Sequence, residues 1–298
     1  MWTFRAMNTD VAVAAPELGD AAERGLALSV EQLFRETERR FSRFLPDSEL
    51  AHLNRAHGPI TVSDELLSLL VRGRAHCVAT GGIFEPAVGA AMQAHGYDRS
   101  FAPGVLDRDD EPAASSHASI CMLEIDEERR RVTRPAPVQV DFGGFLKGLT
   151  VDRAAALTTA AVMVDAGGDA AMRGAPPGDA GWIVEIEDPS DPAQIMGAIT
   201  VRDQAVATSA ANRRCWRRGE HAMHHLIDPR TSMPAQTDIA QATVFAPTAE
   251  LADVMAKVAF VSGADNAARE LAQRHLSAVL VLHGGAIRTV GTVELHHA

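Results

Sequence analysis

The sequence of 298 residues has few aromatic side chains and little positive charge. It contains one tyrosine, Tyr97, and three tryptophans, so a stacking surface for single-stranded nucleic acid is not expected. The formal net charge of −11 argues against a general binder of nucleic acid or of anionic membranes, because both ligands require a basic face. A local basic pocket for a phosphorylated ligand remains compatible with this composition.

Cysteine pairs and long apolar runs are also missing. Cys77, Cys121 and Cys215 lie far apart and form no CxxC pair, which excludes a disulfide framework and a thiolate zinc site. No apolar run approaches ~20 residues, so no membrane span is predicted. The first residues carry no basic region, apolar core or cleavage site of an export signal, and we therefore expect a cytoplasmic protein.

The chain has 46% hydrophobic and 22% charged residues, which is ordinary for a globular protein with a sizeable core. Its helical patterns lie among runs of adjacent strand patterns, without a strict βαβ alternation. This order predicts an α+β fold with largely antiparallel sheets flanked by helices, rather than a Rossmann fold. We expect a single domain over residues 1–298, with an exposed, mobile connection at about 99–118 that is rich in Asp, Pro, Ala and Ser.

Periodicity and capping residues predict the individual elements. Ser48 and Ser63 are the expected N-caps of two helices. Helices are predicted at 17–44, 49–55, 63–78, from 84 onward, at 146–160, 249–261 and 264–275. Strands are predicted at 3–14, 120–125, 130–133, 137–141, 161–165, 181–187 and 196–201, with a closing hairpin at 278–294.

The segment His224–Pro234 concentrates imidazole, carboxylate, guanidinium and hydroxyl groups between two prolines. Pro229 and Pro234 prevent a regular element from running through it, so it is predicted to be a rigid loop at the end of a strand. The alternative is a tight turn whose side chains satisfy its own backbone. His221, His224 and His225 resemble a metal cluster, but adjacent histidines on a strand point to opposite faces and cannot easily bind one ion.

Four other stretches combine reactive side chains with glycine or with a helix terminus. Gly143 to Gly148 places glycines and Lys147 at a predicted helix N-terminus, which favours an anion; the spacing is not that of GxGxxG or a P-loop. The others are Asp165 to Asp169, Thr208-Ser209-Ala210, and the pair Asp253 and Lys257 one helical turn apart. Each has a structural alternative: a plain turn, a solvated lysine, or an ordinary (i, i+4) ion pair.

Taken together, in this order and at these separations, the stretches resemble the ApbE-type family of FAD:protein FMN transferases over nearly the whole chain. The matching residues are Met7-Asn8-Thr9, Ser48-Glu49-Leu50 with Asn54, Gly82 to Val88, Asp141 through Lys147-Gly148 with Asp152, Gly167-Gly168-Asp169, the Trp182 strand ending in Asp188-Pro189, Thr208-Ser209, and His225 to Ser232.

The resemblance implies an enzyme that binds FAD and a divalent metal, usually magnesium. It transfers the FMN half to a threonine of an acceptor flavoprotein and releases AMP, or in some members hydrolyses FAD. Asp253 is then the metal ligand, with a backbone carbonyl from the turn Gly144–Leu146, while His225 is the base and Asp228 orients it. The residues expected to contact FAD are Lys147, Thr208 and Ser209 at the phosphates and ring, and Met7, Asn8, Thr9, Glu85, Asp141, Gly167, Gly168 and Asp169 around the flavin and adenosine.

The chain departs from the family pattern at four places. Lys257 stands where the family has a threonine, and an ammonium cannot coordinate magnesium; it can supply positive charge itself, or pair with Asp253 and leave the site without metal. Glycine is replaced at Asn8, Ala210 and Ser232, which can reshape the flavin pocket. Three functional hypotheses follow: an FMN transferase, a non-catalytic FAD-binding protein in which Lys257 has displaced the metal, and an FAD pyrophosphatase.

Overall fold

The computed structural model describes residues 1–113 and 115–296, and the chain divides into two compact units. The first unit consists of Met1–Glu36, Phe145–Ala210 and Thr237–Ala298; the second consists of Thr37–Gly144 and Ala211–Gln236. Residue 114, inside the connection predicted at 99–118, lies outside the described residues. Within the described residues, none of the helices has the length and apolar character needed to span a membrane.

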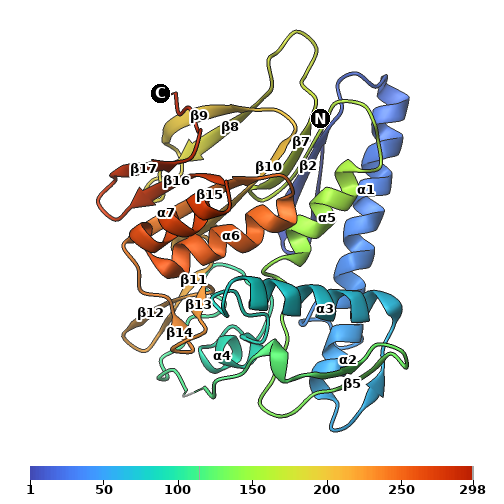
Figure 1. The fold of residues 1–298 in the computed structure, drawn as a ribbon, viewed down its shortest axis with the longest axis vertical. Coiled ribbons are helices and arrows are strands. Elements are labelled where there is room, and N and C mark those ends of the chain that lie inside the picture. The colour runs from blue at the N-terminus through green and yellow to red at the C-terminus, as the bar shows by residue number, and fades with distance from the viewer. Residues whose placement is uncertain (114, 297–298) are drawn as a thin grey trace. The chain divides into compact units, whose positions relative to one another are not determined.

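An eight-stranded sheet forms the centre of the first unit, and every neighbouring pair of its strands is antiparallel (Figure 1). Its strands, in spatial order, are β1 (Trp2–Ala6), β2 (Thr9–Ala14), β6 (Val162–Ala166), β7 (Asp169–Arg173), β10 (Gln204–Ala210), β15 (Ile239–Ala246), β16 (Ser277–Leu282) and β17 (Ile287–Val290). The predicted α+β class with largely antiparallel sheet is confirmed.

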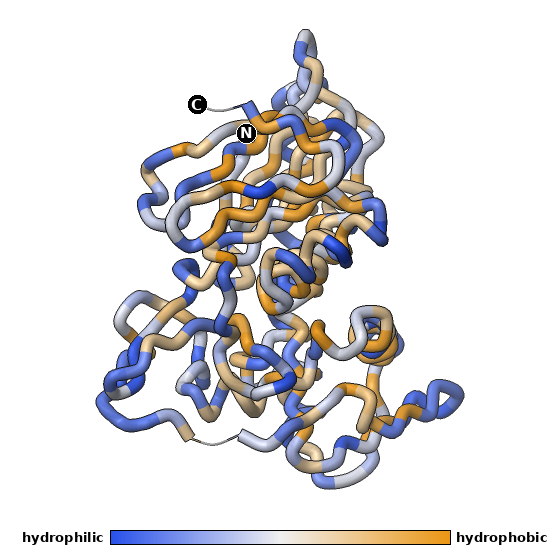
Figure 2. The backbone as a smooth tube through the Cα atoms, turned by 60° about the vertical axis from the view of Figure 1, so that its left-hand side comes forward, coloured by the Kyte–Doolittle hydropathy of each residue, from blue (hydrophilic) through white to orange (hydrophobic). Residues whose placement is uncertain are grey.

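The two faces of this sheet bury different partners, because alternate residues of a strand point to opposite sides. On β10, Ala205 packs in a cluster with α1 (Asp20–Phe41) and α5 (Leu146–Ala155), whereas Val206 packs in a cluster with the hairpin β8 (Trp182–Glu187) and β9 (Ile195–Val201). Helix α6 (Ala249–Ser262) contacts α5, β10 and β15, and α7 (Ala264–Gln273) contacts α6 and β16. Figure 2 shows hydrophobic segments along the strands of this unit and hydrophilic ones at many of its turns.

The second unit is made of short elements and long connections. Its helices are α2 (Glu49–Arg55), α3 (Asp64–Ala79) and α4 (Gly89–Ala94), with a 3-10 turn at η1 (Ile120–Met122). Its strands are β3 (Ile60–Thr61), β4 (Glu124–Asp126) and β5 (Arg131–Thr133) in one sheet, the hairpin β11 (Cys215–Arg218) and β12 (His221–His224), and the pair β13 (Ile227–Asp228) and β14 (Met233–Pro234). Tyr97, Leu106, Trp216 and Met223 form its buried aromatic cluster.

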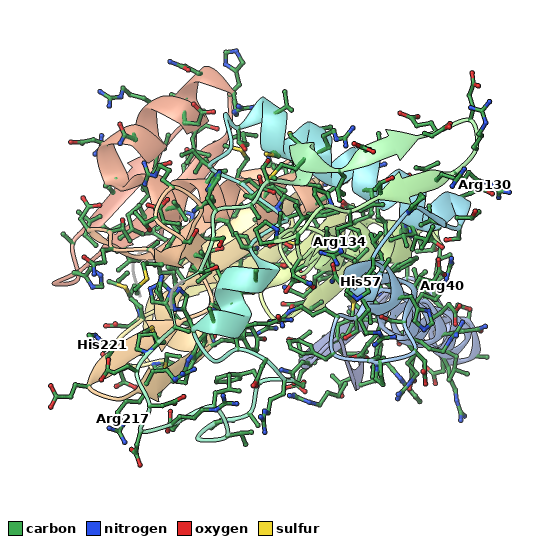
Figure 3. The ribbon with its side chains drawn as sticks, turned by 90° about the horizontal axis from the view of Figure 1, so that it is seen from below. Arg40, His57, Arg130, Arg134, Arg217 and His221 are labelled. Carbon is green, nitrogen blue, oxygen red and sulfur yellow. The ribbon has the colours of Figure 1, made fainter. Side chains whose placement is uncertain are left out.

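An acidic segment binds the basic β11–β12 hairpin of this unit. Asp110 Oδ2 accepts from Arg218 Nη2 at 2.8 Å, and Glu111 Oε2 lies 3.1 Å from His221 Nε2. The amide of Arg108 donates to the carbonyl of Arg217 at 3.0 Å, so the segment continues the hairpin through its backbone. Arg217 and His221 are labelled on this hairpin in Figure 3.

Several predicted elements were wrong in detail. The strand at 3–14 is two strands, because Met7 and Asn8 adopt positive φ values of 50° and 56° and turn the chain. The helix predicted from 84 begins only at Gly89, since residues 84–88 form turns, and the strand at 137–141 is irregular backbone. The helix predicted to reach residue 160 ends at Ala155, and β7 was not predicted.

Candidate functional site

Helix α5 places the start of α6 in the first unit. A side chain at Gly148 would meet the backbone of Ala249 and Glu250, so only glycine allows this close approach of the two helices. Asp152 then accepts hydrogen bonds from Ala249 N at 2.8 Å and Glu250 N at 2.9 Å. Together with the N-cap Thr248, this carboxylate satisfies amides at the start of α6, the helix that carries Asp253.

Two buried lysine–aspartate pairs lie in this unit. Lys147 donates to the carbonyl of Ala166 at 2.8 Å and contacts the carboxylate of Asp169. Lys257 contacts Asp253 Oδ1 and donates to the Asp253 carbonyl at 3.3 Å. Both carboxylate side chains are 2% exposed, against 15% for Lys147 and 21% for Lys257, so the two ammonium groups form the more accessible side of the cluster.

The two pairs act on each other electrostatically. Burial, together with the negative charge of Asp169, raises the pKa of Asp253 to about 6 against the opposing effect of Lys257 and Lys147. Asp253 Oδ2 is buried without a hydrogen-bond partner among the described residues. We therefore call Lys147, Asp169, Asp253 and Lys257 the charge quartet.

Two hairpin turns, the one between β6 and β7 and the one between β1 and β2, lie beside one another next to the charge quartet. Gly167 and Gly168 form the β6–β7 turn with φ values of 65° and 92°, and Gly168 N donates to Asp165 Oδ1 at 2.9 Å. Burial raises the pKa of Asp165, which accepts this bond. A side chain at Gly167 would collide with the hydroxyl of Thr9, the first residue after the Met7-Asn8 turn, so the two turns are in contact.

Strand β10 brings Thr208 and Ser209 to the same sheet. Thr208 Oγ1 lies 3.0 Å from Thr243 Oγ1 on β15, directly across the strand pair. A Cβ atom at Gly168 would lie 3.9 Å from Thr208 Cβ, so Thr208 adjoins the glycine turn. The structure thus gathers Thr9, Lys147, the Gly167–Asp169 turn, Thr208, Asp253 and Lys257 in the first unit.

The loop His224–Pro234 belongs to the second unit and is held by its own hydrogen bonds. His224 is bonded through both ring nitrogens to the backbone, at Ala235 O and Leu226 N, and burial lowers its pKa. His225 is half-buried, and its amide donates to Arg214 O at 3.2 Å. The predicted loop does follow the end of β12, but it contains the short strand pair β13 and β14, which the sequence did not predict.

Asp228 is paired with Arg230. Arg230 Nε and Nη2 each lie 2.8 Å from the Asp228 carboxylate, and Arg230 N donates to it at 2.9 Å. Burial would raise the pKa of Asp228, but these bonds and the charge of Arg230 lower it overall. The carboxylate therefore stabilises the turn after β13.

Two histidines that the sequence motifs did not single out hold the same loop. His95 Nε2 lies 2.6 Å from Ser232 O, and His117 Nδ1 lies 3.1 Å from Pro229 O. Because they come from distant parts of the second unit, no local sequence signal connects them with the loop. Among the described residues, no group of three His, Cys, Asp or Glu side chains is arranged to hold a metal.

Asp141 is fixed by an arginine that the sequence analysis missed. Arg43 Nε donates to Asp141 Oδ2 at 2.5 Å, and the other oxygen of this carboxylate accepts from Gly143 N at 2.6 Å. The guanidinium lies over the rings of Phe44 and Tyr97, 4.0 Å and 4.8 Å from their centroids. Asp141 thereby links a buried cation to the Gly143-Gly144 turn that precedes α5.

Glu85 and Gly144 are also among the predicted site residues. Glu85 Oε1 accepts from Ala87 N and Ile120 N, both at 2.8 Å, and its other oxygen accepts from Cys77 Sγ at 3.2 Å. This carboxylate ties two loops of the second unit together. Gly144 is the last residue of the first segment of the second unit, and the Leu146 carbonyl of the same turn accepts from Thr150 Oγ1 at 2.7 Å.

Known proteins resemble this chain along most of its length. The profile described as the ApbE family matches residues 7–281. The FAD:protein FMN transferase of Treponema pallidum is 33% identical over 270 residues, which are 82% of this chain and 73% of that protein. The one from Rhodobacter capsulatus is 31% identical over 289 residues, 93% of this chain but only 54% of the relative, so the chain spans about half of that protein.

The fold agrees with solved structures. The crystal structure of the ApbE protein from Thermotoga maritima superposes with a TM-score of 0.85 at 25% identity, covering 98% of this chain and 96% of that one. The flavin transferase ApbE of Vibrio cholerae has the same fold, with a TM-score of 0.78 at 21% identity over 98% and 96% of the two chains. On the profile match and the two relatives above 30% identity, this chain belongs to the ApbE family.

Proposed function

We propose that this protein binds FAD and transfers its FMN half to the hydroxyl of a threonine in an acceptor flavoprotein, with release of AMP. The observation that supports this most directly is the charge quartet beside the Gly167-Gly168 turn, on a chain whose relatives are named FAD:protein FMN transferases. Two ammonium groups suit a pyrophosphate, and glycines without side chains suit the close approach of a flat ring.

The proposed reaction balances without another reactant. The threonine oxygen forms a bond to the phosphorus of the FMN half, and the bond from that phosphorus to the bridging oxygen breaks. The electron pair leaves with AMP, and the hydroxyl proton passes to a base. Such a transfer depends on positioning and on neutralising charge on the phosphate oxygens.

The residue types of the first unit match these needs. Lys147 lies in the first turn of α5, where the helix N-terminus also favours an anion. Thr208 and Ser209 supply hydroxyl groups on β10 beside the glycine turn. Met7, Asn8 and Thr9 form the neighbouring turn, and we assign these residues to the FAD site.

We propose His225 as the base. Its neighbour His224 is unsuited, because both of its ring nitrogens are bonded to backbone and burial disfavours its protonated form. His225 lies in the loop that Asp228, Arg230 and His95 stabilise, which gives the imidazole a defined position in the second unit. A base must be held in reach of the hydroxyl whose proton it removes.

The residues around Asp253 do not provide the oxygen ligands that the expected magnesium ion needs. Asp253 Oδ2, buried and without a hydrogen-bond partner among the described residues, suits a cation. Asp253 Oδ1, however, contacts the Lys257 ammonium, and the carboxylate of Asp169 contacts Lys147. One remaining carboxylate oxygen does not make a magnesium site, so the donor set in this arrangement does not fit the ion.

The activity is tested by incubating purified protein with FAD, with and without a flavoprotein that carries an acceptor threonine. We expect AMP release that depends on the acceptor, and a covalent FMN adduct by mass spectrometry. AMP and free FMN without acceptor would indicate a pyrophosphatase instead. Tight FAD binding with no AMP under any condition would leave a non-catalytic FAD-binding protein.

The role of His225 has its own test with a matched control. His225→Ala should abolish AMP release while FAD affinity stays largely unchanged, because a base contributes to the transition state and not to ground-state binding. His221→Ala removes an exposed imidazole on the neighbouring strand and should leave turnover intact. Turnover retained in His225→Ala would dismiss it as the base.

A further inference from the structure

Lysine is almost absent from this chain, and the two lysines it has are in one place. The sequence contains 26 arginines but only Lys147 and Lys257 as lysines. Both belong to the charge quartet of the first unit, on α5 and α6. A surface lysine used for solubility would be scattered among the arginines, so these two positions call for a specific explanation.

Each ammonium has donors left for a ligand. A lysine ammonium carries three N–H donors. Lys147 has two acceptors among the described residues, Ala166 O and the Asp169 carboxylate, and Lys257 has two, Asp253 O and Asp253 Oδ1. Each group therefore keeps one N–H that a phosphate oxygen can accept. The flexible four-carbon stem allows this donor to follow the ligand, which the rigid fork of arginine does not.

The charge of the quartet is balanced without any ion. Two carboxylates that are 2% exposed face two ammonium groups, so the formal charge of the four side chains is zero. A divalent cation bound to the Asp253 carboxylate would lie close to the Lys257 ammonium, because that ammonium already contacts the same carboxylate. Like charges at this separation repel strongly in a buried site, so the ion and the ammonium compete for one position.

We infer that Lys257 is the built-in cation of this site, taking the place of a divalent metal, so that the protein binds the pyrophosphate of FAD and releases AMP without magnesium. This inference rests on the proposed function for the reaction, but its binding part can be measured separately. In it, Lys257 donates to a phosphate oxygen and neutralises charge there, while Asp253 holds the ammonium in place.

The competing explanation is an ordinary ion pair between residues one turn apart on a helix. Such a pair adds little to stability and nothing to ligand binding. The two explanations differ in what the side chain does toward FAD and toward magnesium. Threonine at position 257 removes the ammonium and offers an oxygen, whereas glutamine removes the charge and keeps a hydrogen-bond donor.

The decisive experiment measures magnesium and FAD binding in EDTA-treated protein. In wild type, added magnesium should leave the thermal midpoint unchanged and the FAD dissociation constant within about twofold of its metal-free value. In Lys257→Thr, FAD binding without metal should weaken by about tenfold or more, as expected for the loss of a charged hydrogen bond, and magnesium should restore it and raise the midpoint. Lys257→Gln should lose the affinity without magnesium rescue.

A matched control and a labelling readout complete the test. Arg269→Gln removes an exposed cation from α7 and should change none of these values. Lys147 and Lys257 are the only side-chain amines, so the lysine-containing peptides found by mass spectrometry after acetylation report on these two groups, and FAD should protect both in EDTA. Protection only when magnesium is added would contradict the inference.

The outcomes separate this inference from the proposed function. If AMP release in EDTA depends on the acceptor, both the transferase proposal and the inference stand. If wild type releases AMP only with magnesium, or gains thermal stability from magnesium as Lys257→Thr does, Lys257 is not the cation. If no AMP forms under any condition, the transferase proposal fails, and the FAD affinities of wild type and Lys257→Thr in EDTA still decide the inference. Equal affinities would overturn it.

Discussion

Asp152 on α5 accepts hydrogen bonds from Ala249 at the start of α6, at 2.8 Å, and from the next amide at 2.9 Å. One carboxylate thereby joins two helices, and the second of them carries both Asp253 and Lys257. The contact is made possible by Gly148, whose missing side chain lets the backbones meet. The position of half of the charge quartet thus depends on a residue outside it.

Substitution of Asp152 is therefore expected to lower the free energy of unfolding more than a typical substitution at the surface does. Asp152→Ala leaves two amides without their acceptor and should lower the free energy of unfolding by about 1–3 kcal/mol. Denaturant titration measures this loss. Asp265→Asn is the control, because it removes the charge of an exposed carboxylate near the start of α7 that pairs with Arg288, and it should lower the free energy of unfolding much less than Asp152→Ala does. Equal losses in the two variants would show that Asp152 is not a cap.

Among the arginines of the second unit, we expect substitution of Arg43 to reduce the stability of the fold most. Its side chain is 4% exposed and pairs with Asp141, so Arg43→Ala leaves a carboxylate partly buried without a counter-charge. We expect the free energy of unfolding to fall by about 3–5 kcal/mol. We also expect faster hydrogen exchange at the Gly143 amide, because this amide donates its hydrogen bond to Asp141. Arg99→Ala, which breaks the exposed pair with Asp98, should lower the free energy of unfolding far less than Arg43→Ala does. Unchanged exchange at Gly143 would mean that Arg43 does not act through Asp141.

Sequence patterns predicted elements well where the signal was local. Ser48 and Ser63 cap α2 and α3 as expected, accepting from the amides of Ala51 and Leu66. Helix α6 begins and ends within one residue of its predicted bounds, because a nearly continuous apolar run defines it. Each of these features is determined by neighbouring residues.

The predictions failed where distant residues decide the backbone. Glu85 was read as part of a helix start, but its carboxylate is bonded to Ile120, far along the chain, and residues 84–88 turn instead. Arg43 and His95 stabilise candidate segments through contacts that no spacing in the sequence reveals.

Cys77 should resist alkylation while the other two cysteines react. Burial and the neighbouring Glu85 carboxylate raise its pKa to about 12, whereas Cys121 and Cys215 are exposed. The thiolate is the reactive form, so iodoacetamide at pH 8 should label Cys121 and Cys215 but not Cys77, as read by mass spectrometry.

The same shift predicts how stability depends on pH. The unfolded thiol, with a pKa near 9, loses its proton at lower pH than the folded one, so unfolding becomes more favourable as pH rises from about 9 to about 12. Cys77→Ala should flatten this part of the curve. Rapid labelling of Cys77 at pH 8 in the folded protein, or an unchanged curve in the variant, would contradict the buried Cys77–Glu85 contact.

Ser232 offers a stabilising substitution in the loop that carries the proposed base. Its φ is 58°, a left-handed conformation that costs a residue with a side chain about 1 kcal/mol relative to glycine. The His95 contact uses the Ser232 carbonyl, which every substitution retains. Ser232→Gly should therefore raise the free energy of unfolding by about 0.5–1 kcal/mol, measured by denaturant titration. Ser232→Ala keeps the strained backbone and should give no gain, so a gain in both variants would trace the effect to the hydroxyl instead of the conformation.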